Sequence, residues 1–152
     1  MKMRHLLTAL LLLQTTFGFA NDNWLDKYSD MDGVTSVYIS KAMFKLIPNV
    51  MSDEINLKDI MGKIESLVIL KIDDKNVIAR IQKEMAQKVN RYELLMRIKQ
   101  NKKDIVFYVD GSEESIKELI MCIDDGEEIF SVIRLLGNFL LEDVQTIVSG
   151  IE

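Results

Sequence analysis

The chain has 152 residues, of which 48% are hydrophobic and 28% are charged, and its formal net charge is −5. This length suits one globular domain, and the hydrophobic fraction excludes an intrinsically disordered chain. A single cysteine excludes an intramolecular disulfide framework, and the negative charge argues against a protein that holds nucleic acid through phosphate contacts.

Residues 1–20 have the order of a secretory signal peptide. A basic start, Met1–Arg4, precedes the apolar run Leu6–Leu13, and small residues end the segment at Ala20. This run is far shorter than the roughly 18 to 20 residues needed to span a bilayer, which disfavours the alternative of an uncleaved membrane anchor. No later segment is long and apolar enough to cross a membrane. We therefore expect cleavage after Ala20, export to the periplasm or the medium, and one domain over residues 21–152.

Cleavage would also remove the only histidine of the chain, His5. Without histidine, the mature chain forms no Ser-His-Asp triad, no Cys-His dyad and no His-ligated metal site. The loss of Lys2 and Arg4 would make the mature protein more acidic still.

The first part of the mature chain is predicted to contain two strands. Residues 34–40 (VTSVYIS) are β-branched and aromatic, which is typical of a strand. Residues 66–72 (SLVILKI) form a nearly continuous apolar run, as expected of a strand buried on both faces. The other expected elements are an amphipathic lead-in at 21–28, a turn at 30–33, a helix at 41–47 closed by Pro48, a polar connector at 49–56 and a short helix at 57–64.

The clearest helix follows the second strand. Its apolar residues recur at steps of three and four and form one stripe along a helix of about 16 residues within 74–90. The residues of this stripe are Val77, Ile78, Ile81, Met85 and Val89. The carboxylate of Asp73 or Asp74 is predicted to cap its first turn.

The C-terminal part is predicted to form a four-stranded antiparallel meander followed by a helix. Residues 116–123 fit a helix or a strand, and we predict a strand because Asp124-Asp125-Gly126 is a hairpin-turn sequence. Gly137 and Asn138 are expected to break the last strand. The predicted strands are 92–98, 105–109, 116–123 and 129–136, and the final helix is 140–149. The expected fold is therefore α+β, with this meander packed by helices and two further N-terminal strands.

Both faces of the predicted meander are apolar, so both should be covered at least in part. We expect the helices at 74–90 and 140–149 to pack on one face. The N-terminal helices, a curl of the sheet or a partner would then cover the other face.

The acidic residues come in adjacent pairs. Paired carboxylates are used in glycoside hydrolysis and in calcium binding, but each pair here falls at a predicted cap or turn, where carboxylates have a structural role. The pairs are Asp73/Asp74, Glu113/Glu114, Asp124/Asp125 and Glu127/Glu128. The segment 30–33 (DMDG) fails as an EF-hand, because the ligand positions of such a loop would fall on Tyr28 and Ile39.

The remaining candidates for chemistry also have structural interpretations. Cys122 lies in an apolar run, which predicts a buried inert thiol, with an intermolecular disulfide as the alternative. Lys99, Lys102 and Lys103 are expected at a solvated hairpin tip. The sequence contains no phosphate-binding, dinucleotide-binding or nucleophile-elbow motif. We expect no cofactor and no metal.

The segment 24–47 (WLDKYSDMDGVTSVYISKAMFKLI) resembles the N-terminal signature of the domain of unknown function 4252 family, exported proteins found mainly in Bacteroidetes. Later segments fit as well, including Tyr92–Met96 and Glu118–Ile120, so the similarity covers essentially the whole mature chain. The resemblance implies an envelope protein of a Gram-negative bacterium. The neighbourhood of such genes to sigma-factor and anti-sigma genes implies an envelope sensing role. The resemblance to this family supplies no catalytic residue.

Three hypotheses follow for function. The first is a non-catalytic periplasmic or secreted module that binds an envelope protein, as a sensor or adaptor. The second is a carrier of a small apolar ligand or lipid held between the meander and the helices. The third is a hydrolase that uses carboxylates alone, with Asp30 or Asp32 as the residues to test. Candidate binding residues are Tyr38, Ser40 and Lys41.

Overall fold

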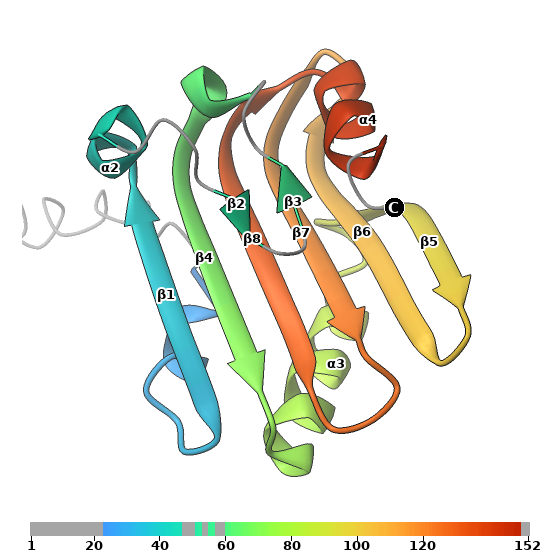
Figure 1. The fold of residues 1–152 in the computed structure, drawn as a ribbon. Coiled ribbons are helices and arrows are strands. Elements are labelled where there is room, and N and C mark those ends of the chain that lie inside the picture. The colour runs from blue at the N-terminus through green and yellow to red at the C-terminus, as the bar shows by residue number, and fades with distance from the viewer. Residues whose placement is uncertain (1–22, 47–50, 53–54, 57–59, 150–152) are drawn as a thin grey trace, which may run out of the picture.

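The computed structural model describes residues 23–46, 51–52, 55–56 and 60–149. Its centre is a six-stranded antiparallel sheet with the strand order β1-β4-β8-β7-β6-β5, shown in Figure 1. The strands are β1 (Val34–Ser40), β4 (Ile64–Ile72), β5 (Glu93–Gln100), β6 (Lys103–Ser112), β7 (Ser115–Asp124) and β8 (Phe130–Phe139). A separate two-stranded pair joins β2 (Met51–Ser52) and β3 (Ile55–Asn56).

Helices lie on both faces of the sheet. They are the 3₁₀ turns η1 (Asp26–Tyr28) and η2 (Met61–Lys63), and the α-helices α2 (Lys41–Leu46), α3 (Lys75–Gln87) and α4 (Leu141–Ser149). The predicted α+β class is confirmed. The strand count differs from the prediction, because the meander and the two N-terminal strands form one sheet and the β2–β3 pair lies outside it.

The two long helices pack on opposite faces, so the prediction of a common face is wrong. Val144 and Ile147 of α4 belong to one core, with Phe44 of α2. Ile81 of α3 belongs to the other core, with Trp24 from the segment before η1. In Figure 1, α4 lies in front of the sheet and α3 behind it. Each face is thus covered by one C-terminal or central helix and one N-terminal element.

Local chemistry explains why α3 begins where it does. The carboxylate of Asp74 accepts hydrogen bonds from the backbone N–H groups of Asn76 at 2.8 Å and Val77 at 3.0 Å, which confirms it as the N-cap. The apolar stripe of the helix, represented by Val77, Ile81 and Met85, is buried against the sheet. Val89 lies beyond the end of α3 and is exposed, so the stripe is one turn shorter than predicted.

The strand predicted at 116–123 is confirmed as β7, but the predicted break at Gly137 and Asn138 is wrong. Strand β8 continues through both residues to Phe139. A Cβ atom on Gly137 would lie 2.2 Å from the carbonyl oxygen of Lys63. The glycine therefore allows the close approach of the chain before β4, and it does not end the strand.

The region before β4 was predicted less well. The helix expected at 57–64 is a single 3₁₀ turn, η2, and Ile64 already begins β4. The connector expected at 49–56 contains the β2–β3 pair. The helix expected at 41–47 is present as α2. Residues 1–22, 47–50 and 57–59 lie outside the described residues, and with them the signal peptide and Pro48.

Candidate functional site

Three of the paired carboxylates that sequence analysis singled out, Asp74, Asp124 and Asp125, accept backbone hydrogen bonds in a cap and a turn. Besides the cap at Asp74, Asp124 accepts a hydrogen bond from the N–H of Gly126 at 2.9 Å. Asp125 accepts from the N–H of Glu127 at 2.8 Å and of Ile129 at 3.1 Å. Among the residues that the structure describes, no group of three or more acidic, histidine or cysteine side chains is arranged to hold a metal ion. Asp74, Asp124 and Asp125 therefore have a structural role.

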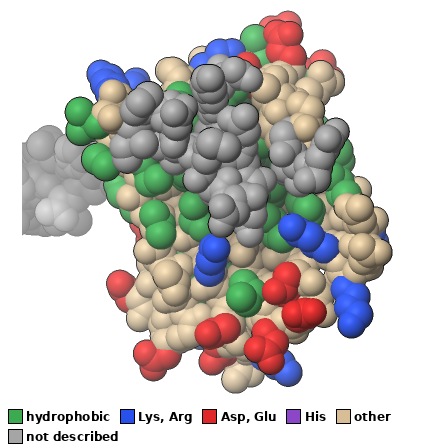
Figure 2. Space-filling view, viewed as in Figure 1, with side chains coloured by type: hydrophobic (Ala, Val, Ile, Leu, Met, Phe, Trp, Pro, Cys, Tyr) green, Lys and Arg blue, Asp and Glu red, His purple; other side chains and the backbone are tan. Residues whose placement is uncertain are grey.

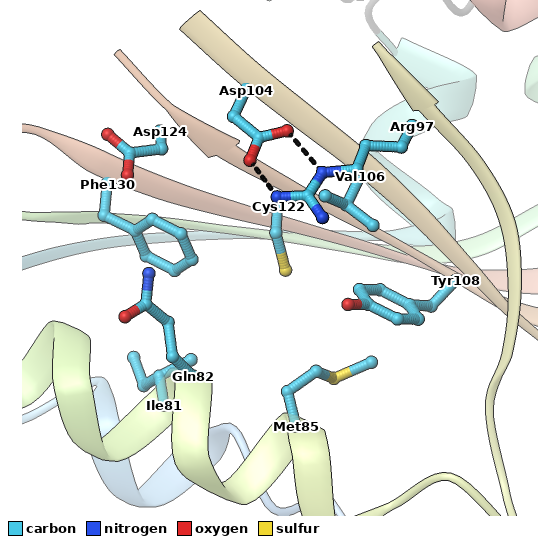
Figure 3. Close-up of a pocket in the computed structure, with 10 residues that line it drawn as sticks. All are labelled: Ile81, Gln82, Met85, Arg97, Asp104, Val106, Tyr108, Cys122, Asp124 and Phe130. Atoms are coloured by element: carbon cyan, nitrogen blue, oxygen red, sulfur yellow. Dashed lines mark hydrogen bonds and ion pairs between the residues drawn. The ribbon is translucent and has the colours of Figure 1, made fainter. Parts of the chain in front are cut away.

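A cleft of about 170 Å³ lies between α3 and the sheet, and Figure 3 shows its walls. Its floor contains Cys122 and Tyr108, and Met85 of α3 faces them. At the rim, Arg97 forms an ion pair with Asp104, with 2.5 Å between Nη2 and Oδ2. This volume is below the roughly 300 Å³ at which pockets for drug-sized ligands begin, so the cleft admits a few waters or a small apolar group.

The cleft has no activated nucleophile. Burial raises the pKa of the Cys122 thiol to about 12, so the thiol stays protonated at neutral pH. Burial also raises the pKa of Tyr108 above its ordinary value. The predicted burial of Cys122 is confirmed.

A buried polar network crosses the same face of the sheet. Glu118 on β7 is 2% exposed and Arg134 on β8 is 4% exposed, and Arg134 Nε donates to Glu118 Oε1 at 2.5 Å. Tyr92 donates its hydroxyl to the same oxygen at 3.0 Å, and Arg91 donates to Glu118 Oε2 at 3.0 Å. Trp24 Nε1 donates to the Tyr92 hydroxyl at 3.1 Å. The network thus ties the N-terminal segment to the centre of the sheet.

Every part of this network has a partner, so it is a structural element. Among the described residues, no buried side-chain nitrogen or oxygen lacks a hydrogen bond. Burial, and then the charge of Glu118, raises the pKa of Tyr92. The Tyr92 hydroxyl therefore stays protonated and acts as the donor in its hydrogen bond to Glu118. Sequence analysis missed this network, and its signal was the charged residue Arg134 within the apolar run of β8.

A second polar cluster attaches η1 to α3. Tyr28 donates its hydroxyl to Glu84 Oε2 at 2.5 Å, and Lys27 Nζ lies 2.7 Å from the same carboxylate oxygen. Burial, and then the hydrogen bond with Glu84, raises the pKa of Tyr28 to about 12. Partial burial acts to raise the pKa of Glu84, but the hydrogen bonds from Lys27 and Tyr28 outweigh it and lower this pKa.

The three residues predicted for binding lie together at the outer edge of the sheet. Among the strands of the described residues, β1 has β4 on one side and none on the other. The side chain of Tyr38 on β1 is 66% exposed, and Ser40 ends the strand. Lys41 begins α2 and is exposed. Tyr38, Ser40 and Lys41 thus follow one another where β1 ends and α2 begins, and their role in binding stays a prediction.

The two edges of the sheet differ in chemistry. The β5 edge carries Glu93, Arg97 and Lys99, and its register with β6 shifts between Leu94 and Met96. Charges and bulges of this kind protect an edge strand against pairing with another chain. Strand β1 contains no charged residue, no proline and no register shift over Val34–Ser40. The β1 edge is therefore open to strand addition in a way that the β5 edge is not.

The backbone groups that β1 presents outward can be identified. The N–H of Asp73 donates to the carbonyl of Gly33 at 3.0 Å, so this pair is bonded across the β1–β4 ladder. Bonded pairs alternate in an antiparallel ladder, so the odd-numbered residues of β1 bond to β4. The even-numbered residues, from Val34 to Ser40, turn their N–H and C=O groups to the open edge.

An apolar groove of about 380 Å³ lies on the opposite side of the molecule, between α4 and β5. Its walls include Leu95 and Met96 of β5 and Val144 and Val148 of α4.

The described helices are all too short or too polar to cross a membrane.

The family model described as Domain of unknown function (DUF4252) matches residues 28–147. No curated protein and no solved structure gives a significant match to the chain.

Proposed function

The chain belongs to that family, whose description names no activity. We propose that the protein is a non-catalytic protein-binding module. Its binding surface is the outer edge of β1, where an extended segment of a partner adds as a further strand. The proposal keeps the predicted export by a cleaved signal peptide, so that the module works in the cell envelope as a sensor or adaptor.

The observation that supports this function is the unprotected edge. Four consecutive even-numbered positions offer main-chain N–H and C=O groups, and strand addition uses such groups for affinity. Val37 and Tyr38, 44% and 66% exposed, supply the alternating side chains that give specificity. Asp74, Asp124 and Asp125 already accept backbone hydrogen bonds in a cap and a turn, which disfavours the carboxylate hydrolase.

A photoreactive residue tests the proposed surface in the cells that produce the protein. We place p-benzoylphenylalanine at Val37 on the β1 edge and, as a control, at Leu94 on the β5 edge, which is 55% exposed. Irradiation should give a discrete covalent adduct from position 37 and none from position 94. Adducts at both positions, or at neither, would contradict strand addition at β1.

The α4 groove favours a second function, the carriage of a small apolar ligand. Its lining is mostly aliphatic, with Gln145 and Ser149 as polar residues at its margin. Native mass spectrometry with added laurate should then show one bound molecule, and Val148→Trp should remove it by filling the groove. A protein that stays free of laurate at saturating concentration would exclude this function.

A further inference from the structure

The partner that the β1 edge fits is a second copy of the same chain. Resting on the proposed function of this edge, we propose that two copies pair β1 with β1 in antiparallel orientation, about a two-fold axis through Val37. The two sheets then form one continuous sheet, in which Ser36 of each copy lies opposite Tyr38 of the other. Three features of the β1 edge support this pairing.

The first observation is which residues of β1 direct their backbone N–H and C=O groups to the open edge. The even-numbered residues of β1 face outward, and a full antiparallel overlap of Val34–Ser40 with itself places Val34 opposite Ser40 and Ser36 opposite Tyr38. Both members of each of these pairs are outward-bonding residues, as a hydrogen-bonded antiparallel pair requires. Val37 then meets its own counterpart as a non-bonded pair.

The second observation is the distribution of charge at the two ends of β1. Asp30 and Asp32 precede the strand, and Lys41 and Lys45 follow it; all four are exposed. Antiparallel self-pairing brings the acidic end of each copy beside the basic end of the other, at both ends of the seam. Figure 2 shows basic side chains at the α2 end of this margin and acidic side chains at the other end. Because the pairing has two-fold symmetry, each favourable contact occurs twice in the dimer.

The third observation is the apolar surface that borders the strand. Met43 and Leu46 of α2, the helix that directly follows β1, are 42% and 75% exposed, and Val37 and Tyr38 of β1 are 44% and 66% exposed. Figure 1 shows α2 at the end of β1, on the outer margin of the sheet. In the paired molecule this helix lies beside the turn that precedes β1 of the second copy. Its side chains thereby widen an interface that a strand pair alone would leave narrow.

Engineered cysteines test the register. In an antiparallel non-bonded pair the Cα atoms are about 4.5 Å apart, within the range that a disulfide spans. Val37→Cys should therefore give a covalent dimer with oxidised glutathione. Val34→Cys alone should not, because six residue steps separate the two copies of this position, about 20 Å along the strands. The double variant Val34→Cys, Ser40→Cys should cross-link again.

The wild-type chain is the control for these variants, because its Cys122 is buried and should not cross-link. Cross-linking of Val34→Cys as fast as Val37→Cys would overturn the two-fold register. Failure of Val37→Cys to cross-link, in a protein with an unchanged circular dichroism spectrum, would overturn the self-pairing.

Sedimentation velocity tests the charge complementarity. Lys41→Glu with Lys45→Glu should weaken dimerisation about tenfold, as expected from a few exposed ion pairs of up to about 1 kcal/mol each. Adding Asp30→Lys and Asp32→Lys should restore it, because opposite charges face each other again. A dimer that ignores both sets of substitutions, or a wild-type chain that is monomeric at its highest soluble concentration, would overturn the proposal.

The mass of the adduct from the photoreactive Val37 variant separates the two proposals. An adduct of twice the chain mass supports self-pairing. A monomeric purified protein with an adduct to a different protein refutes self-pairing and leaves β1 as a binding edge. A monomeric protein with no adduct refutes both.

Discussion

The buried ion pair between Arg134 and Glu118 should be the most sensitive polar contact of the fold. Arg134→Ala removes the cation and leaves the carboxylate of Glu118, 2% exposed, with only Tyr92 and Arg91 as donors. Removing one partner of a buried ion pair costs about 3–5 kcal/mol, and the remaining ion pair with Arg91 places the expected loss at the lower end of this range. Because domains of this kind are stable by about 5–15 kcal/mol, the variant should lose roughly a fifth or more of its free energy of unfolding.

Urea unfolding measures this loss directly. The chain has one tryptophan, Trp24, which is buried and hydrogen-bonded to the network through Tyr92. Its fluorescence therefore reports the loss of the structure around the ion pair. The matched control is Arg97→Ala, which breaks the exposed pair with Asp104, where the arginine side chain is 50% exposed. That variant should lose far less stability than Arg134→Ala, because solvent screens an exposed ion pair.

A double-mutant cycle completes the test. Replacing both members, Arg134→Leu with Glu118→Leu, should cost less than the sum of the two single substitutions, because no unpartnered charge of the pair remains buried. The reasoning is refuted if Arg134→Ala costs no more than Arg97→Ala, or if the two single losses simply add.

Three further predictions concern other parts of the molecule. Cys122 should not react with Ellman's reagent in the native protein at neutral pH, since burial raises its thiol pKa to about 12, and it should react at once in denaturant; rapid native labelling would contradict this burial. Gly137→Ala should lower the free energy of unfolding by about 1–3 kcal/mol through overpacking, because its Cβ would lie 2.2 Å from a carbonyl oxygen, whereas Gly62→Ala, with open space around it, should change stability little in the same urea assay. The lowered pKa of Glu84 stabilises the fold above its unfolded value near 4.5, and this contribution is lost as the pH falls through the folded pKa. Glu84→Gln should therefore flatten the dependence of the urea midpoint on pH below about 4.5, and Lys27→Met should reduce it; equal slopes in all three proteins would exclude the effect.

Local patterns in the sequence were sufficient for most elements of the sheet. The meander strands alternate or run apolar over their length, and the turn at Asp124–Gly126 marks β7 as a strand even though its composition also suits a helix. The cap at Asp74 follows from the affinity of carboxylates for free N–H groups, which depends on a few neighbouring residues only. These features are local, so a single sequence contains the information that determines them.

Features that depend on distant contacts could not be predicted in the same way. Periodicity shows which side of a helix is buried, but not which face of the sheet it covers, so the opposite placement of α3 and α4 was missed. Gly137 looks like a strand breaker until the chain at Lys63 is seen beside it. The partner of Arg134 could not be identified either, because Glu118 lies on the neighbouring strand and many carboxylates compete for that role in the sequence.

The candidate site illustrates the same division. The sequence predicts Tyr38, Ser40 and Lys41 as binding residues, and they lie at the end of β1 and the start of α2. Their significance depends on the strand order, since β1 would offer no backbone groups if it lay inside the sheet. The sequence shows an uncharged strand, and only the topology shows that this strand is an edge.

The buried polar groups and the charges at the sheet edges have complementary roles in the fold. Inside, Glu118 and Arg134 are retained at a high desolvation cost, and they fix the N-terminal segment through Tyr92 and Trp24. Residues 25–33 connect that segment to β1, which is itself held in the sheet by its ladder with β4. At the other edge, charges and a bulge prevent pairing. A sheet that is protected on one side and both anchored and open on the other has a single direction in which another strand can be added.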